Sequence, residues 1–237
     1  MKLTILGNSG PYPCAGGACS GYLLSSDSGD TNVLIDCGTG VLANLSRALP
    51  WEKLDAVILS HLHFDHMSDM LPMQYALQFH PRTNPLPVYA PLTPAPVRAL
   101  LDVSAYGLHP MEDGRIGALS VQFFPGRHPV ESRAMRIECD STCFVYTGDT
   151  NEVEGLDAFA AGADLLLADA GLSSDDWKMA APHLSAAGCG RLARSAGAKR
   201  LLLTHFNPKY DPAQLAAEAR TEFEHAELAE IGAQYAI

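Results

Sequence analysis

Short apolar runs separated by polar or glycine-rich loops recur along the chain and predict a mixed α/β protein. The continuous apolar run Ala56–Leu59 is typical of a strand buried on both faces of a sheet, whereas Leu119–Phe124 alternates as a half-buried strand does. The expected strands are Lys2–Leu6, Gly21–Ser25, Asn32–Asp36, Ala56–Leu59, Leu86–Ala90, Leu119–Phe124, Met135–Cys139, Thr142–Tyr146, Asp164–Ala168 and Arg200–Thr204. Glycines and prolines exclude a regular element between Gly7 and Gly21.

Helices are expected between these strands, the first following the turn Asp36–Gly40 and ending near Pro50. The others are Ser68–Gln78, Pro94–Val103, Gly155–Ala161, Ser185–Ala196 and Pro212–Phe223. Hairpins in the first half and alternating helices and strands in the second half predict sheets that are covered on the outside by helices. The chain shows no internal repeat and no linker, so a single domain over residues 1–237 is expected.

A cluster of metal-binding residue types follows the buried strand Ala56–Leu59. The segment Ser60–His66 reads Ser-His-Leu-His-Phe-Asp-His and offers three imidazoles and a carboxylate, the donors that zinc and related divalent ions accept. In an extended backbone His61 and His63 point to the same side, and Asp65 and His66 lie where a helix can begin. The segment could therefore supply ligands to two metals. The alternative is a solvated polar loop.

Other candidate ligands also follow expected strands. His128, Asp149 and His205 each stand directly after one. Ligands at strand ends from distant parts of the chain would converge on one edge of the sheets, which makes the pattern more specific than any single histidine.

Composition limits the choice of partner and location. The chain has 16 basic and 27 acidic residues and a net charge of −11, which argues against binding of nucleic acid through a large basic surface. No apolar run is long enough to span a membrane, and the N-terminal segment turns polar too early for a signal peptide, so a cytoplasmic location is expected. Six scattered cysteines are expected to be reduced thiols, with a second metal site at Cys14/Cys19 or Cys139/Cys143 as the alternative.

The motif His61-x-His63-x-Asp65-His66 with His128, Asp149 and His205 resembles the metallo-β-lactamase superfamily of dinuclear metallohydrolases. The resemblance extends from Asp36 to the segment Thr204-His205-Phe206. It implies an α/β (α+β) αββα sandwich of two mixed β-sheets flanked by helices. By the family pattern, His61, His63 and His128 would hold one metal, Asp65, His66 and His205 the other, and Asp149 would bridge. Asp36 would orient the ligand loop from behind, unless it is only a turn-capping residue.

The expected cofactors are two divalent metal ions, zinc first, with manganese and iron as alternatives. Bound water would then be acidified to a pKa of about 7, giving a metal-bridging hydroxide as nucleophile. Asp65 is therefore counted among the catalytic residues as well as the ligands.

A second stretch resembles the ribonuclease Z-like phosphodiesterase branch. His183 in Pro182–Ala187 stands where that group has a catalytic histidine, and Asp169, at the preceding strand end, stands where the group has a Glu as its partner. The pair could protonate the leaving oxygen. The alternative is that His183 merely begins the helix at Ser185.

The sequence departs from that branch in ways that bear on the substrate. Only twenty residues separate His128 from Asp149, which leaves no room for the branch's tRNA-gripping arm. A cyclic nucleotide, a short oligonucleotide or an RNA 3′ end is therefore expected in place of full tRNA processing. Arg127, Arg133 and Lys209 could meet a phosphate, and the loop Gly171–Pro182 could form a wall of the cleft.

The expected function is thus that of a zinc-dependent phosphodiesterase, with a small phosphodiester or nucleotide, or short RNA, as substrate. A hydrolase of carboxylic esters, lactones or thioesters on the same metals is the alternative, and an iron redox protein is a third. No membrane partner is expected. The superfamily also implies a homodimer.

Overall fold

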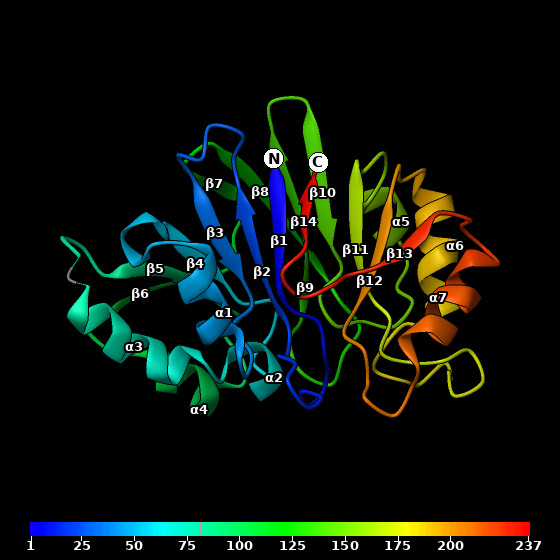
Figure 1. Ribbon diagram of the computed structural model, residues 1–237, viewed down its shortest axis with the longest axis horizontal. Coiled ribbons are helices and arrows are strands. Elements are labelled where there is room, and N and C mark those ends of the chain that lie inside the picture. The colour runs from blue at the N-terminus through cyan, green and yellow to red at the C-terminus, as the bar shows by residue number, and fades with distance from the viewer. Residues whose placement is uncertain (81) are drawn as a thin grey trace.

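Two seven-stranded β-sheets lie face to face, and helices cover the outer face of each (Figure 1). The computed structural model describes residues 1–80 and 82–237. The first sheet runs in the order β14 (Gln234–Ala236), β1 (Lys2–Gly7), β2 (Gly21–Ser25), β3 (Asn32–Ile35), β4 (Ala56–Ile58), β5 (Leu86–Tyr89) and β6 (Tyr106–His109). The second runs in the order β13 (Ala226–Leu228), β12 (Leu201–Thr204), β11 (Leu165–Asp169), β10 (Thr142–Tyr146), β9 (Arg133–Cys139), β8 (Leu119–Pro125) and β7 (Gly114–Ile116). The expected αββα sandwich is confirmed.

Each sheet is antiparallel in one half and parallel in the other. In the first sheet β3 to β6 are parallel, and in the second β10 to β13 are parallel. The carboxyl ends of β3, β4, β10, β11 and β12 therefore meet at one edge of the sandwich, the lower edge in Figure 1. Every candidate ligand lies at this edge.

Helices flank the sheets in two groups. The first sheet carries α1 (Val41–Ala48), α2 (Phe64–Met67), α3 (Met70–Phe79) and α4 (Ala95–Arg98), with short 3₁₀ turns at Trp51–Lys53 and Ala99–Leu101. The second carries α5 (Leu156–Phe159), α6 (Ala186–Ala196) and α7 (Pro212–Arg220). Helix α6 begins with the Ser185 side chain accepting from the Gly188 N–H and ends at Gly197, which has a positive φ.

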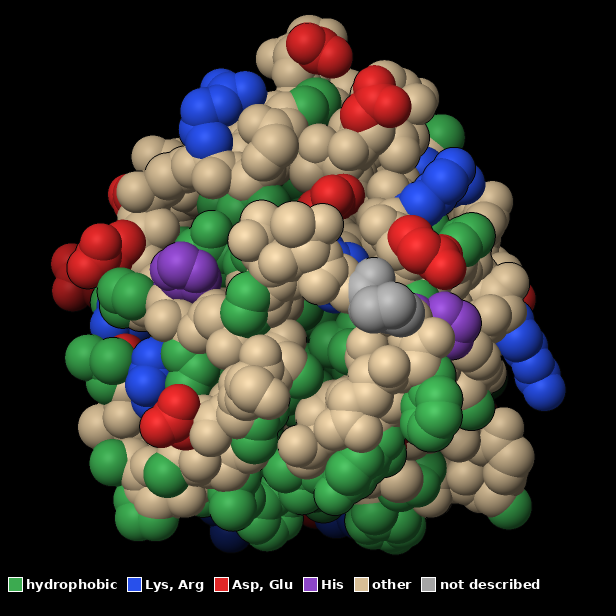
Figure 2. Space-filling view, turned by 90° about the vertical axis from the view of Figure 1, so that its left-hand side faces the viewer, with side chains coloured by type: hydrophobic (Ala, Val, Ile, Leu, Met, Phe, Trp, Pro, Cys, Tyr) green, Lys and Arg blue, Asp and Glu red, His purple; other side chains and the backbone are tan. Residues whose placement is uncertain are grey.

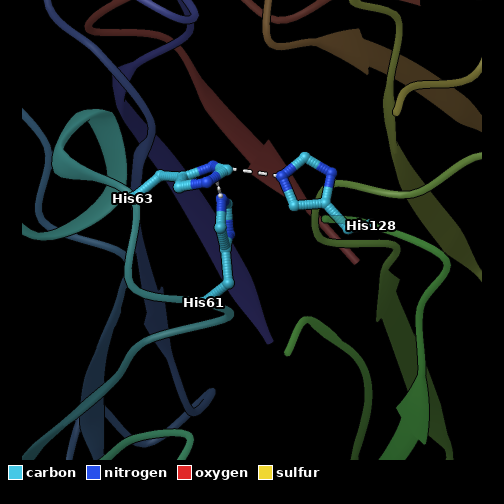
Figure 3. A group of neighbouring side chains, drawn as sticks. All are labelled: His61, His63 and His128. Atoms are coloured by element: carbon cyan, nitrogen blue, oxygen red, sulfur yellow. Dashed lines mark hydrogen bonds between the residues drawn. The ribbon is translucent and has the colours of Figure 1, made fainter. Parts of the chain in front are cut away.

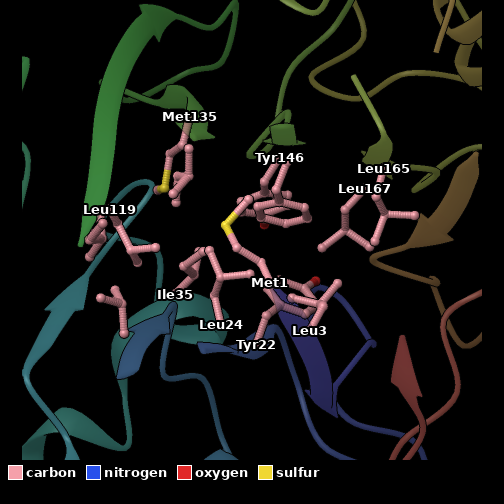
Figure 4. Close-up of a cluster of buried hydrophobic side chains, with 14 of the residues drawn as sticks. Met1, Leu3, Tyr22, Leu24, Ile35, Leu119, Met135, Tyr146, Leu165 and Leu167 are labelled. Atoms are coloured by element: carbon pink, nitrogen blue, oxygen red, sulfur yellow. The ribbon is translucent and has the colours of Figure 1, made fainter. Parts of the chain in front are cut away.

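Three apolar layers hold the sandwich together. The central layer lies between the sheets and includes Leu24, Ile35, Met135 and Leu167, all with no more than 1% exposure (Figure 4). Two outer layers pack the helices onto the sheets. Strands such as β4 and β11 are thus covered on both faces, which explains their uninterrupted apolar sequences.

Several expected elements differ from the structure. The helix expected at Ser68–Gln78 is α3, which is preceded by the separate short helix α2, and the one expected at Pro94–Val103 is α4 with a 3₁₀ turn. Strands β6, β7, β13 and β14 were not predicted from the sequence. They are short and form the edges of the two sheets, where a half-exposed strand carries little apolar signal.

The outer face of α3 is apolar and exposed. Figure 2 views this side of the molecule and shows apolar side chains gathered over its lower part. Leu71, Tyr75 and Phe79 recur every four residues along α3, with exposures of 36%, 58% and 82%, and the helix contains no charged residue. Phe64 and Leu100 are also exposed apolar residues, at 61% and 46%.

Candidate metal centre

The loop after β4 is anchored from below by one buried carboxylate. Asp36 accepts hydrogen bonds from the Ser60 N–H at 2.7 Å and from the Ser60 hydroxyl at 2.8 Å. It also accepts from Tyr146 at 3.0 Å, and its Oδ2 lies 2.8 Å from Nδ1 of His66. Asp36 is fully buried and has a φ of 56°, a costly conformation for a residue other than glycine. Asp36 therefore contacts the ligand loop, His66 and Tyr146 at the same time.

Three imidazoles converge beside this loop (Figure 3). Nε2 of His61 and Nε2 of His128 each lie 3.1 Å from Nδ1 of His63. Nitrogens around a tetrahedral zinc are separated by about 3.3 Å, given Zn–N bonds of about 2.0–2.1 Å. Burial lowers the pKa of all three rings, most strongly that of His61, so they present neutral nitrogens. This spacing fits a single divalent ion.

Hydrogen bonds from behind set which nitrogen faces the centre. The Ser60 hydroxyl donates to Asp36, so it accepts from Nδ1–H of His61 at 3.1 Å and leaves Nε2 unprotonated. Nδ1 of His128 donates in the same way to the Pro182 carbonyl at 3.0 Å. Such backing fixes ring orientation and raises ligand basicity.

A second group of donors adjoins the first. Nε2 of His205 lies 3.2 Å from Oδ2 of both Asp65 and Asp149, and Nε2 of His66 lies 3.4 Å from Oδ1 of Asp149. Oδ2 of Asp149 is also 3.7 Å from Nε2 of His61, so this carboxylate stands between the two groups. Nε2 of His66 and Oδ1 of Asp149 are buried and have no hydrogen-bond partner among the residues that the structure describes. Buried nitrogen and oxygen atoms that lack a hydrogen-bond partner could act as ligands of a second cation.

Charges in the second group also fit cations. Burial opposes ionisation of Asp149, but His205 and His66 outweigh it and hold the pKa of that carboxyl well below its ordinary value. The pKa of Asp65 is likewise lowered, because His66 and His205 outweigh its burial. Two buried carboxylates that stay ionised need positive partners.

His205 is placed by backbone strain and a close glycine. It follows β12 with a φ of 59°. A Cβ on Gly10 would lie 1.9 Å from Nε2 of His205, so the N-terminal loop can approach only as glycine. The loop is tied there because the Phe206 N–H donates to the Asn8 carbonyl at 2.8 Å.

The two residues of the predicted dyad are in contact. Nδ1 of His183 lies 2.9 Å from Oδ2 of Asp169, which is fully buried and also accepts from the Gly171 N–H. The His183 ring stacks on His205 with centroids 4.9 Å apart, and its side chain is 17% exposed. Burial lowers the pKa of His183, but Asp169 outweighs it and raises the pKa above its ordinary value. The pair therefore stands at the rim of the metal centre, and the contact with Asp169 favours the protonated form of the ring.

The candidate phosphate contacts are mostly engaged elsewhere. Arg133 pairs with Glu131 at 3.0 Å, and Lys209 pairs with Asp176 at 2.7 Å. The guanidinium of Arg127 reaches only a backbone carbonyl, that of Glu152, at 3.5 Å. Within the described residues all six cysteines are free, and no candidate metal-binding group contains one.

Two groups that shape the site, Tyr146 and the Pro182 carbonyl, were not predicted from the sequence. Tyr146 reads as a core residue of an apolar strand, and no sequence signal links it to Asp36. The Pro182 carbonyl is a backbone group and leaves no residue signature. By contrast, the missing arm was predicted: the residues between His128 and Asp149 are taken up by β9 and β10.

The fold and the paired donor groups define a metallo-β-lactamase-type protein. The model of the "Beta-lactamase superfamily domain" matches residues 31–206. The chain belongs to this superfamily. The probable metallo-hydrolase YhfI of Bacillus subtilis is 36% identical over 234 residues, covering 94% of each chain.

Solved structures agree. The crystal structure of YhfI, a metallo-β-lactamase fold protein, superposes with a TM-score of 0.92 at 35% identity over 99% of both chains. Human tRNase Z, short form, shares the fold with a TM-score of 0.81 at 21% identity, covering 100% of this chain and 99% of that one.

The ribonuclease Z of Halorubrum lacusprofundi is similar in sequence: it is 28% identical over 289 residues, covering 94% of this chain and 93% of that protein. Among the described residues, no helix has the length and apolar character needed to cross a membrane.

Proposed function

We propose that this protein is a dinuclear metal-dependent phosphodiesterase that acts on small substrates. The observation that carries the proposal is the His183–Asp169 contact at the rim of the metal centre. A metal site alone would serve many hydrolytic reactions. A protonated imidazole beside it is suited to a reaction whose leaving group is a poor, alkoxide-like oxygen.

The residues that would hold the metals fall into two sets. His61, His63 and His128 would hold one ion, Asp65, His66 and His205 the other, and Asp149 would contribute to both. Nitrogen-rich ligation favours zinc, with manganese and iron as alternatives. When bound, two divalent ions acidify water to a pKa of about 7 and polarise a phosphoryl group.

The chain's own residues would complete the reaction. A water that has released one proton to solvent forms a bond from its oxygen to phosphorus, while the bond from phosphorus to the leaving oxygen breaks. The Nε2 proton of His183 passes to that leaving oxygen, and Asp169 holds the ring by its Nδ1–H and stabilises its positive charge. The ring must lie within hydrogen-bond reach of the leaving oxygen, which its stacking on His205 favours.

A small substrate is supported by the shape and charge of the chain. The hairpin of β9 and β10 replaces any long arm between His128 and Asp149, and the net charge is −11. A cyclic nucleotide, a short oligonucleotide or a short RNA 3′ end needs fewer contacts than a folded RNA does. The similarity to a ribonuclease Z supports a phosphodiester as the bond that is cleaved, but it does not bear on the size of the substrate.

A panel of substrates tests the proposal. The purified protein is titrated with zinc and then with manganese, and assayed with an aryl phosphodiester, cyclic nucleotides, a tRNA precursor, a lactone and a thioester. Activity on the phosphodiesters that saturates at two metal equivalents is expected. Turnover confined to the lactone or the thioester would contradict the proposal and indicate a carboxylic ester hydrolase. Oxygen consumption by the iron-loaded protein would instead indicate a redox function.

A further inference from the structure

We propose that Asn151 is a positioning residue that holds His128 and His183 in place together, through the loop Trp177–Pro182. The assigned roles of these two histidines rest on the proposed function. The contacts that link these histidines to Asn151 through the loop do not depend on the proposed function, because they are features of the structure itself.

Asn151 is buried, at 1% exposure, and its side chain is saturated with hydrogen bonds. Its oxygen accepts from the Trp177 indole N–H at 2.9 Å and from the Glu152 N–H at 2.6 Å. Its amide group points to three carbonyls of one loop: Lys178 at 3.1 Å, Met179 at 3.3 Å and Ala181 at 2.7 Å. One side chain thus holds both the start and the end of this loop.

The end of the loop carries two groups of the site in succession. The Pro182 carbonyl accepts from Nδ1 of His128 at 3.0 Å, and the next residue, His183, contacts Asp169 at 2.9 Å. A shift of the loop would therefore move the carbonyl that orients a metal ligand and the imidazole of the dyad at the same time.

Asn151 also acts on His128 from the opposite side, through its main chain. The Asn151 N–H donates to the Arg127 carbonyl at 3.0 Å, and the Arg127 N–H donates to the Thr150 hydroxyl at 2.8 Å. The backbone before His128 and the carbonyl behind its ring are consequently fixed to the same two residues, Thr150 and Asn151.

Within the described residues, the other hydrogen bonds of the loop between Trp177 and Ala181 are local: the Trp177 N–H donates to the Ser173 carbonyl at 3.1 Å and the Ala181 N–H to the Lys178 carbonyl at 2.8 Å. Lys178, Met179 and Ala180 are exposed, with Met179 at 69%, and Trp177 is only half-buried. Segments with few buried apolar contacts open locally at low cost. The hydrogen bonds to Asn151 are therefore expected to decide where Pro182 and His183 stand.

The test measures metal affinity and loop position, neither of which needs a substrate. Trp51→Phe leaves Trp177 as the remaining tryptophan, so its emission reports the loop. In that background Asn151→Ala is expected to red-shift the emission. It should also weaken the affinity for one of the two ions by about 10–100-fold, as loss of a hydrogen bond to a metal ligand does, and leave the affinity for the other ion unchanged. Binding is followed by competition with a chromophoric chelator for zinc.

Asn44→Ala is the matched control, because the Asn44 amide on α1 donates its hydrogen bond to the Leu6 carbonyl of β1, at 2.7 Å, and not to the loop Trp177–Pro182. It should bind both ions as the parent does. Asn151→Asp keeps the acceptor for Trp177 but loses the amide donors, and it is measured in the same way if Asn151→Ala does not fold. Unchanged affinity for both ions, or weakened affinity without an emission shift, would overturn the proposal. A protein that binds two zinc ions but cleaves no phosphodiester would instead contradict only the proposed function.

Discussion

Asp36 and His66, thirty residues apart in sequence, are joined by a 2.8 Å contact between carboxylate Oδ2 and ring Nδ1, both side chains being fully buried. Nδ1 is thereby held as the donor, and Nε2 of His66 is turned towards Asp65 and Asp149. The same carboxylate fixes Ser60 at the start of the ligand loop. One acidic residue thus orients ligands of both metal groups.

Asp36→Asn should weaken metal binding about 10–100-fold, because an amide cannot accept all four hydrogen bonds that the carboxylate accepts. The buried donors left without partners should also lower the free energy of unfolding by roughly 1–3 kcal/mol. Chelator competition and urea unfolding measure the two effects. Asp164→Asn is the control for metal affinity, because Asp164 pairs with Lys199 at 2.6 Å and accepts from the Cys143 N–H at 2.8 Å, outside the ligand loop. Wild-type affinity in Asp36→Asn would contradict this role.

Gly10→Ala should displace His205, since the added Cβ would lie 1.9 Å from its Nε2. The expected result is one bound ion per chain in place of two, measured by elemental analysis after dialysis. Gly107→Ala is the matched control, because its Cβ would meet no atom closer than 3.8 Å. Two ions in Gly10→Ala would show that His205 is not needed as a ligand.

Metal removal should destabilise the protein. The ionised Asp65 and Asp149 carboxylates and the orphaned Nε2 of His66 lie buried at the centre, so ions bind the folded chain in preference to the unfolded one. Free metal at a hundred times its Kd should add about 2.7 kcal/mol per site. Thermal unfolding with zinc and with a chelator measures the difference. Equal midpoints would argue against the metal centre.

The apolar face of α3 predicts a homodimer. Leu71, Tyr75 and Phe79 form an exposed apolar row without a charged neighbour on the helix, and a chain of net charge −11 meets least repulsion from a second copy there. The double change Tyr75→Glu and Phe79→Glu should convert dimers to monomers in sedimentation experiments. Ile231→Glu, at an exposed apolar residue outside α3, should not. A wild-type monomer would contradict the prediction.

Much of the site was predictable because its residues follow strands. Parallel strands bring their carboxyl ends to one edge, so His61, Asp149 and His205 could be placed together from the pattern alone. Tyr146 could not, because an aromatic residue in an apolar strand is ordinarily core. Asn151 could not either, since its partners are backbone carbonyls of a loop that has no regular pattern.

The fold was predictable to a similar degree. Buried strands such as β4 and β11 have uninterrupted apolar sequences, whereas β13 and β14 are short and pair only through contacts distant in sequence. The helix expected at Ser68–Gln78 is present as α3, and the helix start expected at Asp65 and His66 lies in α2.

The most direct test of the central claim compares the wild type with His183→Ala on a cyclic nucleotide, whose leaving oxygen is alkoxide-like, each protein loaded with two equivalents of zinc. Loss of the proton donor should lower kcat about 10²–10⁴-fold while both ions stay bound. His109→Ala, at an exposed histidine that stacks on Tyr89, is the control and should keep the wild-type rate. A wild-type protein without phosphodiesterase activity, or a His183→Ala variant as fast as the wild type, would contradict the account.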